Sequence, residues 1–276
     1  MKVYLTPDPV RTASMNTEQL RESFLISNLF KPGQIDMVYC DVDRAVVGSA
    51  CPVAETLRLG TDDELRAAYF TERRELGILN IGGRGSVSVE GKTFEMDNLD
   101  GLYIGRGNKD IRFTSADRNA PAEFYLLSYP AHTTHPTAHA KKAQAAAVNL
   151  GSEATCNKRT IYKYIHLDGI KSCQLVMGFT QLQVGSDWNT MPPHTHLRRS
   201  EVYLYFNVPA EHRVFHMMGQ PKESRHLVVA DKQAVISPPW SIHAGVGTSN
   251  YTFCWGMGGE NQTFDDMDAA PIAMLR

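Results

Sequence analysis

The sequence of 276 residues lacks the features that mark disulfide-rich, membrane-spanning and nucleic-acid-binding proteins. Its five cysteines are scattered and form no Cys-x-x-Cys pair, which argues against a disulfide framework and for a reducing compartment. No stretch approaches the roughly 18 apolar residues of a membrane span. Lys and Arg total 28 against 30 Asp and Glu, so no basic excess favours a nucleic-acid partner. The N-terminus lacks the apolar core of a secretory signal, and we therefore expect a cytoplasmic protein without a membrane partner.

What remains is the composition of an ordinary folded protein, with 42% hydrophobic and 21% charged residues. Two short helices are predicted. Residues 16–19 (Asn-Thr-Glu-Gln) resemble a capping box and predict a helix that runs to about Leu29. Residues 61–64 (Thr-Asp-Asp-Glu) have the same kind of opening and predict a second helix to about Phe70.

Most of the remaining chain consists of short apolar runs broken by Gly, Pro, Asn and Asp, a pattern typical of strands and turns. Ser86–Val89 alternates and Thr93–Met96 resumes after a tight turn at Gly91, which predicts a hairpin. Further strands are expected at Leu102–Ile104, Phe124–Leu127, Gln174–Val184, Val202–Phe206, Arg213–Met218, Leu227–Val229, Ala234–Ile236 and Tyr251–Trp255. The chain is therefore predicted to be all-β, a barrel or sandwich with a few short helices.

A change of composition divides the chain. Residues 131–154 hold an Ala/Lys/Gln run and polar residues, and they predict a linker between a domain at 1–130 and a domain at 155–276. The first domain contains no histidine before His132, so it cannot build a histidine-rich metal site. The three histidines at 132, 135 and 139 are interrupted by Pro136, and the linker is the better interpretation of them.

The sharpest local pattern is His194-Thr-His196, followed by Glu201 at the head of an apolar strand. Residues two apart in a strand share a face, so the two imidazoles are expected side by side. An antiparallel hairpin would place Glu201 across from them, and His243, after a Pro-rich turn, is the best candidate for a fourth ligand. Three imidazoles and a carboxylate suit a divalent ion such as Zn²⁺, Fe²⁺, Mn²⁺ or Ni²⁺. The alternative is a loop with solvated surface histidines.

This arrangement resembles the metal motif of the cupin superfamily, a His-x-His pair followed by Glu and, later in the chain, by a last His. A closer resemblance, to the family of 4-deoxy-L-threo-5-hexosulose-uronate ketol-isomerases, covers essentially the whole chain. It is carried by Glu72–Asn80, Gly101–Gly107, Trp188–His196 and Gly256–Gln262.

The resemblance implies two jelly-roll cupin domains, of which the N-terminal one is metal-free. It implies one Zn²⁺ per chain on His194, His196, Glu201 and His243, and a homo-oligomer, in that family usually a hexamer. The implied reaction converts 5-dehydro-4-deoxy-D-glucuronate into 3-deoxy-D-glycero-2,5-hexodiulosonate during the breakdown of pectin and related uronates.

Such a reaction needs a cation for the substrate carboxylate. If the strand after Arg198 is regular, Arg199 shares a face with Glu201, Tyr203 and Tyr205. We therefore predict Arg199 as the carboxylate-binding residue and Tyr203 or Tyr205 as pocket wall, although the arginines could equally be surface charges and the tyrosines core residues. The catalytic base is left open; Glu201 is either a permanent ligand or a ligand that swings away, and we favour the permanent ligand.

The opposite face of the same strand, Val202, Leu204 and Phe206, is apolar and is expected to be covered by the N-terminal domain or another subunit. Three rival functions stay open. The chain could be a related cupin isomerase acting on 5-deoxy-glucuronate, an iron-dependent cupin dioxygenase, or a uronate-binding cupin without turnover. Metal content, oxygen uptake and turnover would distinguish them.

Overall fold

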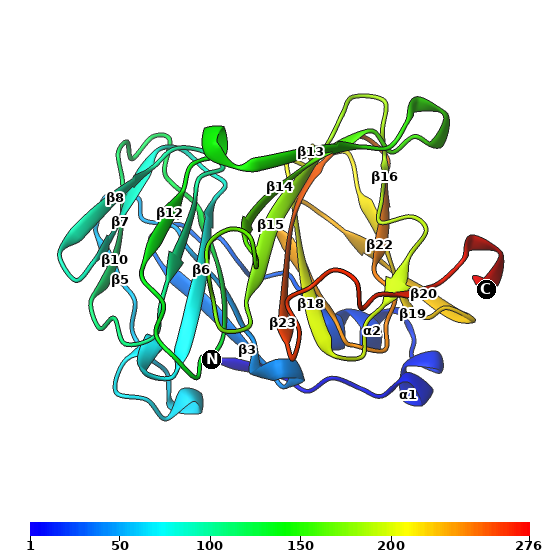
Figure 1. Ribbon diagram of the computed structural model, residues 1–276, viewed down its shortest axis with the longest axis horizontal. Helices are drawn as coiled ribbons and strands as arrows, with labels where there is room; N and C mark the ends of the chain where they lie inside the picture. Colours follow the sequence, from blue (N-terminus) through cyan, green and yellow to red (C-terminus); the bar gives the residue numbers. More distant parts are fainter. The chain divides into compact units, whose positions relative to one another are not determined.

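Strands far outnumber helices in the computed structural model, which describes residues 1–276 (Figure 1). The ten strands predicted from the sequence all fall on observed strands, and the all-β prediction is confirmed. The chain divides into two compact units, one of residues 1–3, 28–146 and 164–176 and one of residues 4–27, 147–163 and 177–276. No helix is long and apolar enough to cross a membrane.

The first unit contains two sheets whose apolar side chains, such as Ile78 and Phe113, form one buried core. Its seven-stranded sheet has the order β1 (Lys2–Tyr4), β3 (Ile35–Cys40), β4 (Val46–Ala50), β11 (Phe124–Pro130), β6 (Arg74–Asn80), β9 (Gly101–Ile104) and β12 (Ala138–Ala140). Its four-stranded sheet has the order β5 (Leu57–Arg58), β10 (Ile111–Ser115), β7 (Gly85–Val89) and β8 (Lys92–Met96). β7 and β8 form the predicted hairpin, and Glu90 and Gly91 in its turn are both left-handed, as a two-residue type I′ turn requires.

The second unit repeats this plan with a seven-stranded and a four-stranded sheet. The larger sheet has the order β13 (Ala146–Leu150), β14 (Arg159–Ile165), β15 (Val176–Leu182), β23 (Thr252–Gly259), β18 (Arg199–Phe206), β21 (Gln233–Ser237) and β2 (Leu25–Ile26). The smaller sheet has the order β16 (Trp188–Asn189), β22 (Ala244–Gly247), β19 (Val214–Gln220) and β20 (Glu223–Val229). A separate pair joins β17 (His194–Thr195) to β24 (Asp268–Ala269).

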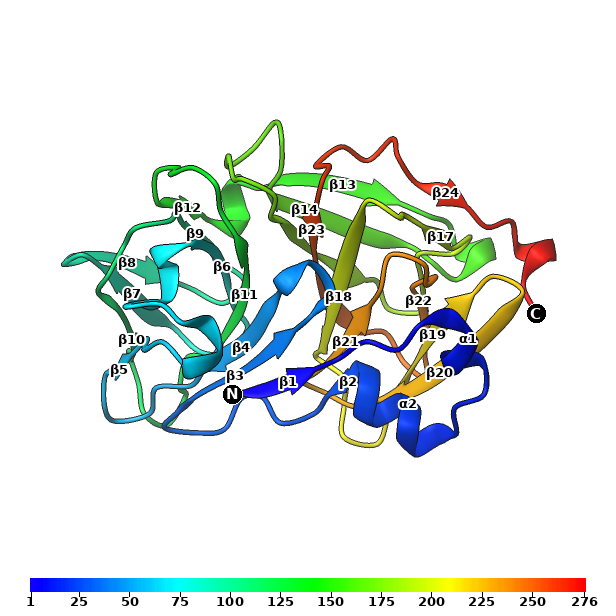
Figure 2. The same cartoon turned by 90° about the horizontal axis from the view of Figure 1, so that it is seen from below.

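The N-terminal residues 4–27 belong to the second unit, although the sequence places them before the first unit. They contain α1 (Pro9–Ala13) and α2 (Thr17–Phe24), which lie beside β19 and β20 (Figure 2). Asn16 and Gln19 form the predicted capping box, each side chain accepting a bond of 3.0 Å from the other's backbone N–H. The helix ends at Phe24, before the predicted Leu29, because residues 25 and 26 pair with β21.

The second predicted helix, at 61–70, is wrong. The structure has only short 3₁₀ turns at Asp63–Leu65 and Phe70–Glu72. Arg66, directly after the first turn, is left-handed with φ of 46°, which stops helix propagation. The carbonyls of Leu65 and Arg66 instead accept bonds from the guanidinium of Arg73, so tertiary contacts replace the helical ones.

The segment predicted as a linker carries strands of its own. β12 pairs with β9 in the first unit, and β13 joins β14 at the edge of the second unit's large sheet. The face of Val202, Leu204 and Phe206 is at most 1% exposed within the single chain. This apolar face therefore gives no argument for an additional subunit.

Glu75 holds residues 164–176 inside the first unit. Its side chain is fully buried, and its two carboxylate oxygens accept bonds from the backbone N–H groups of Cys173, Gln174 and Leu175 at 2.7, 2.9 and 2.8 Å. The hydroxyl of Tyr103 donates a fourth bond of 2.8 Å, and burial together with Glu75 raises the pKa of that phenol. The carboxylate of Glu75 thus accepts hydrogen bonds from four donors, three in residues 173–175 and one, the Tyr103 hydroxyl, on β9.

We predict that Glu75→Ala lowers the free energy of unfolding by about 3–5 kcal/mol, because it leaves these donors without a partner. Urea unfolding followed by far-ultraviolet circular dichroism, which reports on the strands of both units, measures the change. Glu95→Ala is the matched control, since Glu95 is exposed and lies 3.6 Å from Arg84, a surface pair worth under about 1 kcal/mol. Equal urea midpoints for Glu75→Ala and the control would contradict the role given to Glu75.

Candidate metal centre

The predicted hairpin between the His-x-His pair and Glu201 does not form. β17 pairs with β24, so that His194 lies opposite Ala269 and Thr195 opposite Asp268. The physical reason is the position of Glu201 on β18, a central strand whose two edges are already paired with β21 and β23. No hydrogen-bonding edge remains on β18 for the histidine strand.

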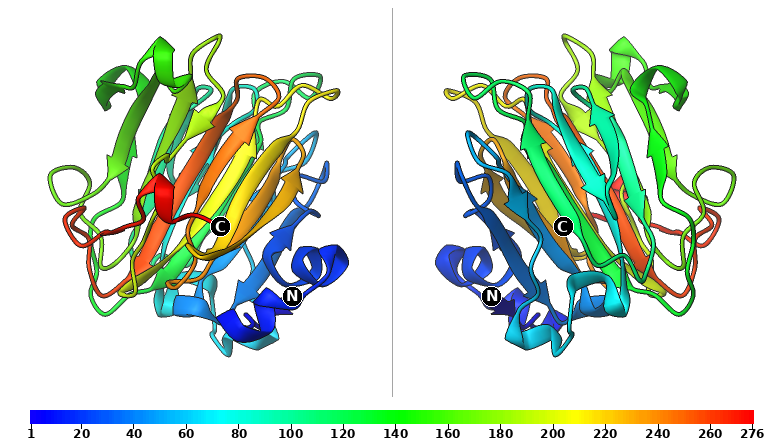
Figure 3. Two further views of the ribbon diagram at one scale, coloured as in Figure 1. Left: turned by 90° about the vertical axis from the view of Figure 1, so that its right-hand side faces the viewer. Right: turned by 90° about the vertical axis from the view of Figure 1, so that its left-hand side faces the viewer.

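The C-terminal segment therefore takes part in positioning the histidines. It runs across the second unit to the β19–β20 turn, as the red ribbon in Figure 3 (left) shows, where Ser224 donates its backbone N–H to the carbonyl of Arg276 at 2.8 Å. On the way, Ala270 donates to the carbonyl of Pro193 at 3.0 Å. These contacts tie the strand of His194 to residues more than 70 positions later in the chain.

His243 reaches the same place from the loop before β22. Ser241 closes a turn by donating its backbone N–H to the carbonyl of Pro238 at 2.9 Å. Two further bonds attach this turn to β19. The backbone N–H of Gly219 donates to the Ser241 hydroxyl at 2.9 Å, and the backbone N–H of Ile242 donates to the carbonyl of Gly219 at 2.9 Å. The Pro-rich turn noted in the sequence thus presents His243 from an anchored loop.

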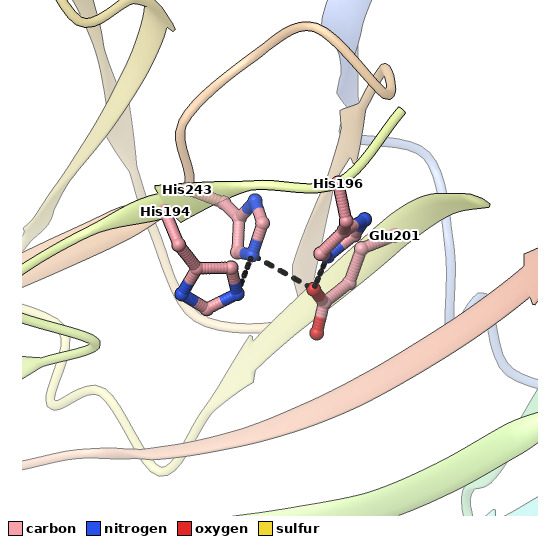
Figure 4. Close-up of side chains that lie close together, drawn as sticks. All are labelled: His194, His196, Glu201 and His243. Carbon is pink, nitrogen blue, oxygen red and sulfur yellow. Dashed lines mark hydrogen bonds and ion pairs between the residues drawn. The ribbon is translucent and has the colours of Figure 1, made fainter. Parts of the chain in front are cut away.

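The four predicted ligands converge (Figure 4). One possible ligand atom from each of His194, His196, Glu201 and His243 lies within 4.8 Å of all the others. Nε2 of His243 is 3.1 Å from Nε2 of His194 and 2.9 Å from Oε2 of Glu201, and Nε2 of His196 is 3.2 Å from the same oxygen. Ligand atoms bound at about 2.1 Å around a tetrahedral ion lie roughly 3.4 Å apart. The cluster therefore fits a single divalent ion.

The electrostatics of the cluster favour a bound positive charge. Burial opposes ionisation of Glu201, but His243 and His196 outweigh it and hold the pKa of that carboxyl below its ordinary value. Burial also disfavours the charged form of His196, yet its bond to Glu201 raises the pKa of the imidazole. Burial, with the charge of His243, lowers the pKa of His194 to about 3, so that ring is neutral at neutral pH. Ionised carboxylate and neutral imidazole are the forms that bind metals. The pKa shifts of Glu201 and His194 therefore favour metal binding, whereas the raised pKa of His196 opposes it.

The ring of His196 is oriented by the backbone. Its Nδ1 lies 2.8 Å from the carbonyl oxygen of Arg199 and donates to it, which leaves Nε2 to face Glu201. A hydrogen bond of this kind on the far nitrogen of a metal-binding histidine fixes the tautomer.

The cluster opens into a cavity of about 420 Å³. Tyr203 lines it, with its hydroxyl 3.0 Å from Oγ1 of Thr190, and burial raises its pKa well above the ordinary value. Tyr205, predicted as the alternative wall residue, lies outside the lining and shares a 2.8 Å hydrogen bond with Nδ1 of His216. Burial lowers the pKa of His216 to about 3 and raises that of Tyr205, so both stay uncharged.

Arg199 reaches the cavity wall, but its charge is engaged elsewhere. It is 1% exposed, and its Nη2 lies 2.8 Å from Oδ1 of Asp266. Nη1 donates to the carbonyls of Asn261 and Thr263. The alternation of side chains along the strand predicted that Arg199 faces the cavity, and the residue lies in the cavity wall. Its guanidinium binds the C-terminal segment.

Two other cations line the cavity that sequence reasoning missed, Arg159 and Lys163 of β14. The sequence gives only a weak indication that these two residues belong to the site. They are two basic residues four positions apart in a strand far along the chain from the His-x-His pair. Apolar residues complete most of the wall: Ile161, Phe253, Trp255, Met257, Phe264 and Met267.

Comparison with known proteins places the chain among isomerases. The model of the KduI/IolB family matches residues 25–272. The 4-deoxy-L-threo-5-hexosulose-uronate ketol-isomerase of Caldicellulosiruptor bescii is 52% identical over 276 residues, which is 100% of both chains. The protein of the same name from Shouchella clausii is 54% identical over 260 residues, 94% of each chain.

Solved structures agree on the fold. An IolB-like protein from Salmonella typhimurium superposes with a TM-score of 0.71 at 14% identity, covering 87% of this chain and 94% of that one. A mutant of Bacillus subtilis oxalate decarboxylase gives a TM-score of 0.59 at 11% identity, covering 87% and 78%. At such identities the likeness concerns the fold alone, and it supports the cupin-like architecture expected from the sequence.

We predict that His243→Ala weakens Zn²⁺ binding by on the order of a hundredfold or more, because it removes one of four converging ligands. Competition with a chromophoric chelator measures the affinity, and elemental analysis after dialysis measures the metal per chain. His226→Ala is the matched control, since His226 is an exposed histidine on β20 of the same unit. One retained equivalent of metal in dialysed His243→Ala would remove this residue from the ligand set.

Proposed function

The chain belongs to the KduI/IolB family, and from this premise we infer that it catalyses the ketol-isomerisation for which its relatives are named. Its substrate is 5-dehydro-4-deoxy-D-glucuronate and its product 3-deoxy-D-glycero-2,5-hexodiulosonate, an interconversion in the breakdown of pectin and related uronates. The observation that carries this assignment is a sequence identity of 50–52% to these relatives over the full length of both chains.

The reaction moves one hydrogen from C2 to C1 and a proton between the two oxygens, so that an aldehyde with a neighbouring hydroxyl becomes a ketone with a neighbouring hydroxyl. We propose that one Zn²⁺ per chain, held by His194, His196, Glu201 and His243, supplies Lewis acidity to the C1 and C2 oxygens when bound. The donor set, three imidazole nitrogens and one carboxylate oxygen within 4.8 Å of one another, supports a divalent ion, and the choice of zinc follows the family resemblance.

Glu201 is proposed as a permanent ligand rather than as the base. It is 4% exposed and within 3.2 Å of two imidazole nitrogens, so its carboxylate is already engaged. A carboxylate whose pKa is lowered holds a proton weakly and is therefore a poor base.

Tyr203 is proposed as a hydrogen-bond donor to the substrate. Its hydroxyl lines the cavity, and its raised pKa keeps the proton on Oη at any ordinary pH. Thr190, also in the wall, fixes the direction of that hydroxyl through their 3.0 Å contact. Tyr203 and Thr190 can thus orient one substrate oxygen toward the ligand cluster without transferring a proton to the substrate.

The homohexamer implied by the family resemblance and the cytoplasmic location expected from the sequence are part of the proposal. The hexamer rests on that resemblance alone, since the apolar face of β18 is covered within one chain.

The assignment predicts that purified protein converts freshly prepared 5-dehydro-4-deoxy-D-glucuronate, with loss of the C2 methine signal in proton NMR as the 2,5-diketo product appears. Treatment with EDTA is expected to slow turnover by on the order of a hundredfold or more, and added Zn²⁺ to restore it. The control substrate is 5-deoxy-glucuronate. No conversion by folded, metal-loaded protein would overturn the assignment, and a higher kcat/KM for the control substrate would transfer it to the related isomerase.

A further inference from the structure

The cavity beside the ligand cluster is polar at two ends, and the side chains between them are apolar except for Thr180 of β15. Its floor follows the large sheet of the second unit, where the strand order is β14, β15, β23 and β18. β18 contributes Glu201 and Tyr203, and β14 contributes Arg159, Ile161 and Lys163, which alternate along the strand and so share one face. The two strands are three spacings of about 4.8 Å apart, roughly 14 Å between backbones.

Neither cation of β14 is paired with a carboxylate. Nη1 of Arg159 donates to the carbonyl of Asn157 at 2.9 Å, and Nζ of Lys163 lies 5.0 Å from the ring centroid of Phe264. Glu201 is the only carboxylate among the lining residues. The cavity therefore holds two half-buried cations without an anionic partner, in contrast to Arg199 with its Asp266.

We propose that Arg159 and Lys163 form the carboxylate subsite of the enzyme. This inference rests on the proposed function, whose substrate carries its carboxylate at C6, the far end from the C1 and C2 oxygens. With those oxygens at the ligand cluster on β18, an open-chain six-carbon acid extends across β23 toward β14. Long basic side chains reaching back from β14 shorten the 14 Å gap, and a charge-assisted bond there fixes the orientation of the substrate.

Of the two strands between the ends, β23 lies next to β18 and suits the middle of the same substrate. β23 lines the cavity with Phe253, Trp255 and Met257 and offers no polar side chain there. A C4 methylene packs on such a wall, whereas a C4 hydroxyl would lose its hydrogen bonds to water without replacement. The layout of cations, apolar side chains and ligand cluster thus suits an acid that carries a methylene at C4.

The main test is steady-state kinetics with 5-dehydro-4-deoxy-D-glucuronate. Lys163→Met and Arg159→Met are expected to raise KM about ten- to a hundredfold each and to leave kcat within about threefold, because each removes a charged contact far from the reacting carbons. Lys163→Arg, which keeps the charge, is expected to stay within about fivefold of the wild-type KM. Lys222→Met is the matched control, an exposed lysine in the turn between β19 and β20.

A second readout needs no turnover. 2-Oxohexanoate carries a carboxylate, a neighbouring ketone and a methylene chain, and 2-hexanone is its counterpart without the carboxylate. Titration followed by ligand-observed NMR is expected to show that Lys163→Met weakens binding of 2-oxohexanoate about tenfold or more and leaves that of 2-hexanone unchanged. Metal content and circular dichroism of each variant are compared with wild type, and Lys163→Met decides the test if Arg159→Met fails to fold.

Unchanged KM values in both methionine variants, together with unchanged 2-oxohexanoate binding, would overturn the subsite. Failure of the proposed function has a different signature, because wild-type protein would then not convert the uronate at all. Charge-dependent binding of 2-oxohexanoate in that case would still support a carboxylate subsite beside the ligand cluster.

Discussion

The negative charge of a buried carboxylate must be compensated by nearby positive or hydrogen-bonding groups. Several parts of the second unit serve this purpose for Glu201. Glu201 lies on the central strand β18, is 4% exposed, and has imidazole nitrogens of His243 and His196 at 2.9 and 3.2 Å. Isolated burial of such a charge is strongly unfavourable. The histidines must therefore be held in place, and three separate segments of chain do so: the anchored turn before β22, the strand β17, and the C-terminal segment that pairs with it.

This requirement gives the end of the chain a role in the site. Arg199 begins the same strand that carries Glu201. Its carbonyl accepts a hydrogen bond from Nδ1 of His196, and its guanidinium binds Asp266. One residue thereby orients an imidazole through its backbone and fixes the segment of β24 through its side chain. A residue in this position helps to set where the ligand atoms lie relative to one another.

The sequence predicts those parts that depend on local pattern. Alternation and turn residues locate the strands, the Asn16–Gln19 capping box locates a helix start, and the spacing of His194, His196 and Glu201 with His243 identifies the cluster. What it does not predict depends on partners distant in the chain. The pairing of β17 with β24 spans over 70 residues, and Arg159 meets the cavity only because the sheet order brings β14 near β23. Residues 61–70 open like a helix, and contacts of Arg73 override that preference.

The two units show how one plan supports chemistry in one place only. Each has a seven-stranded and a four-stranded sheet. In the first, β6 and β10 send Ile78 and Phe113 into an apolar core, none of whose side chains carries a charge. In the second, β18 sends Glu201 and Tyr203 into the corresponding kind of space, which stays open as a cavity because a charged cluster cannot be packed over by apolar side chains without losing stability. The polarity of a few inward positions, rather than the fold, thus decides which unit contains the candidate metal cluster.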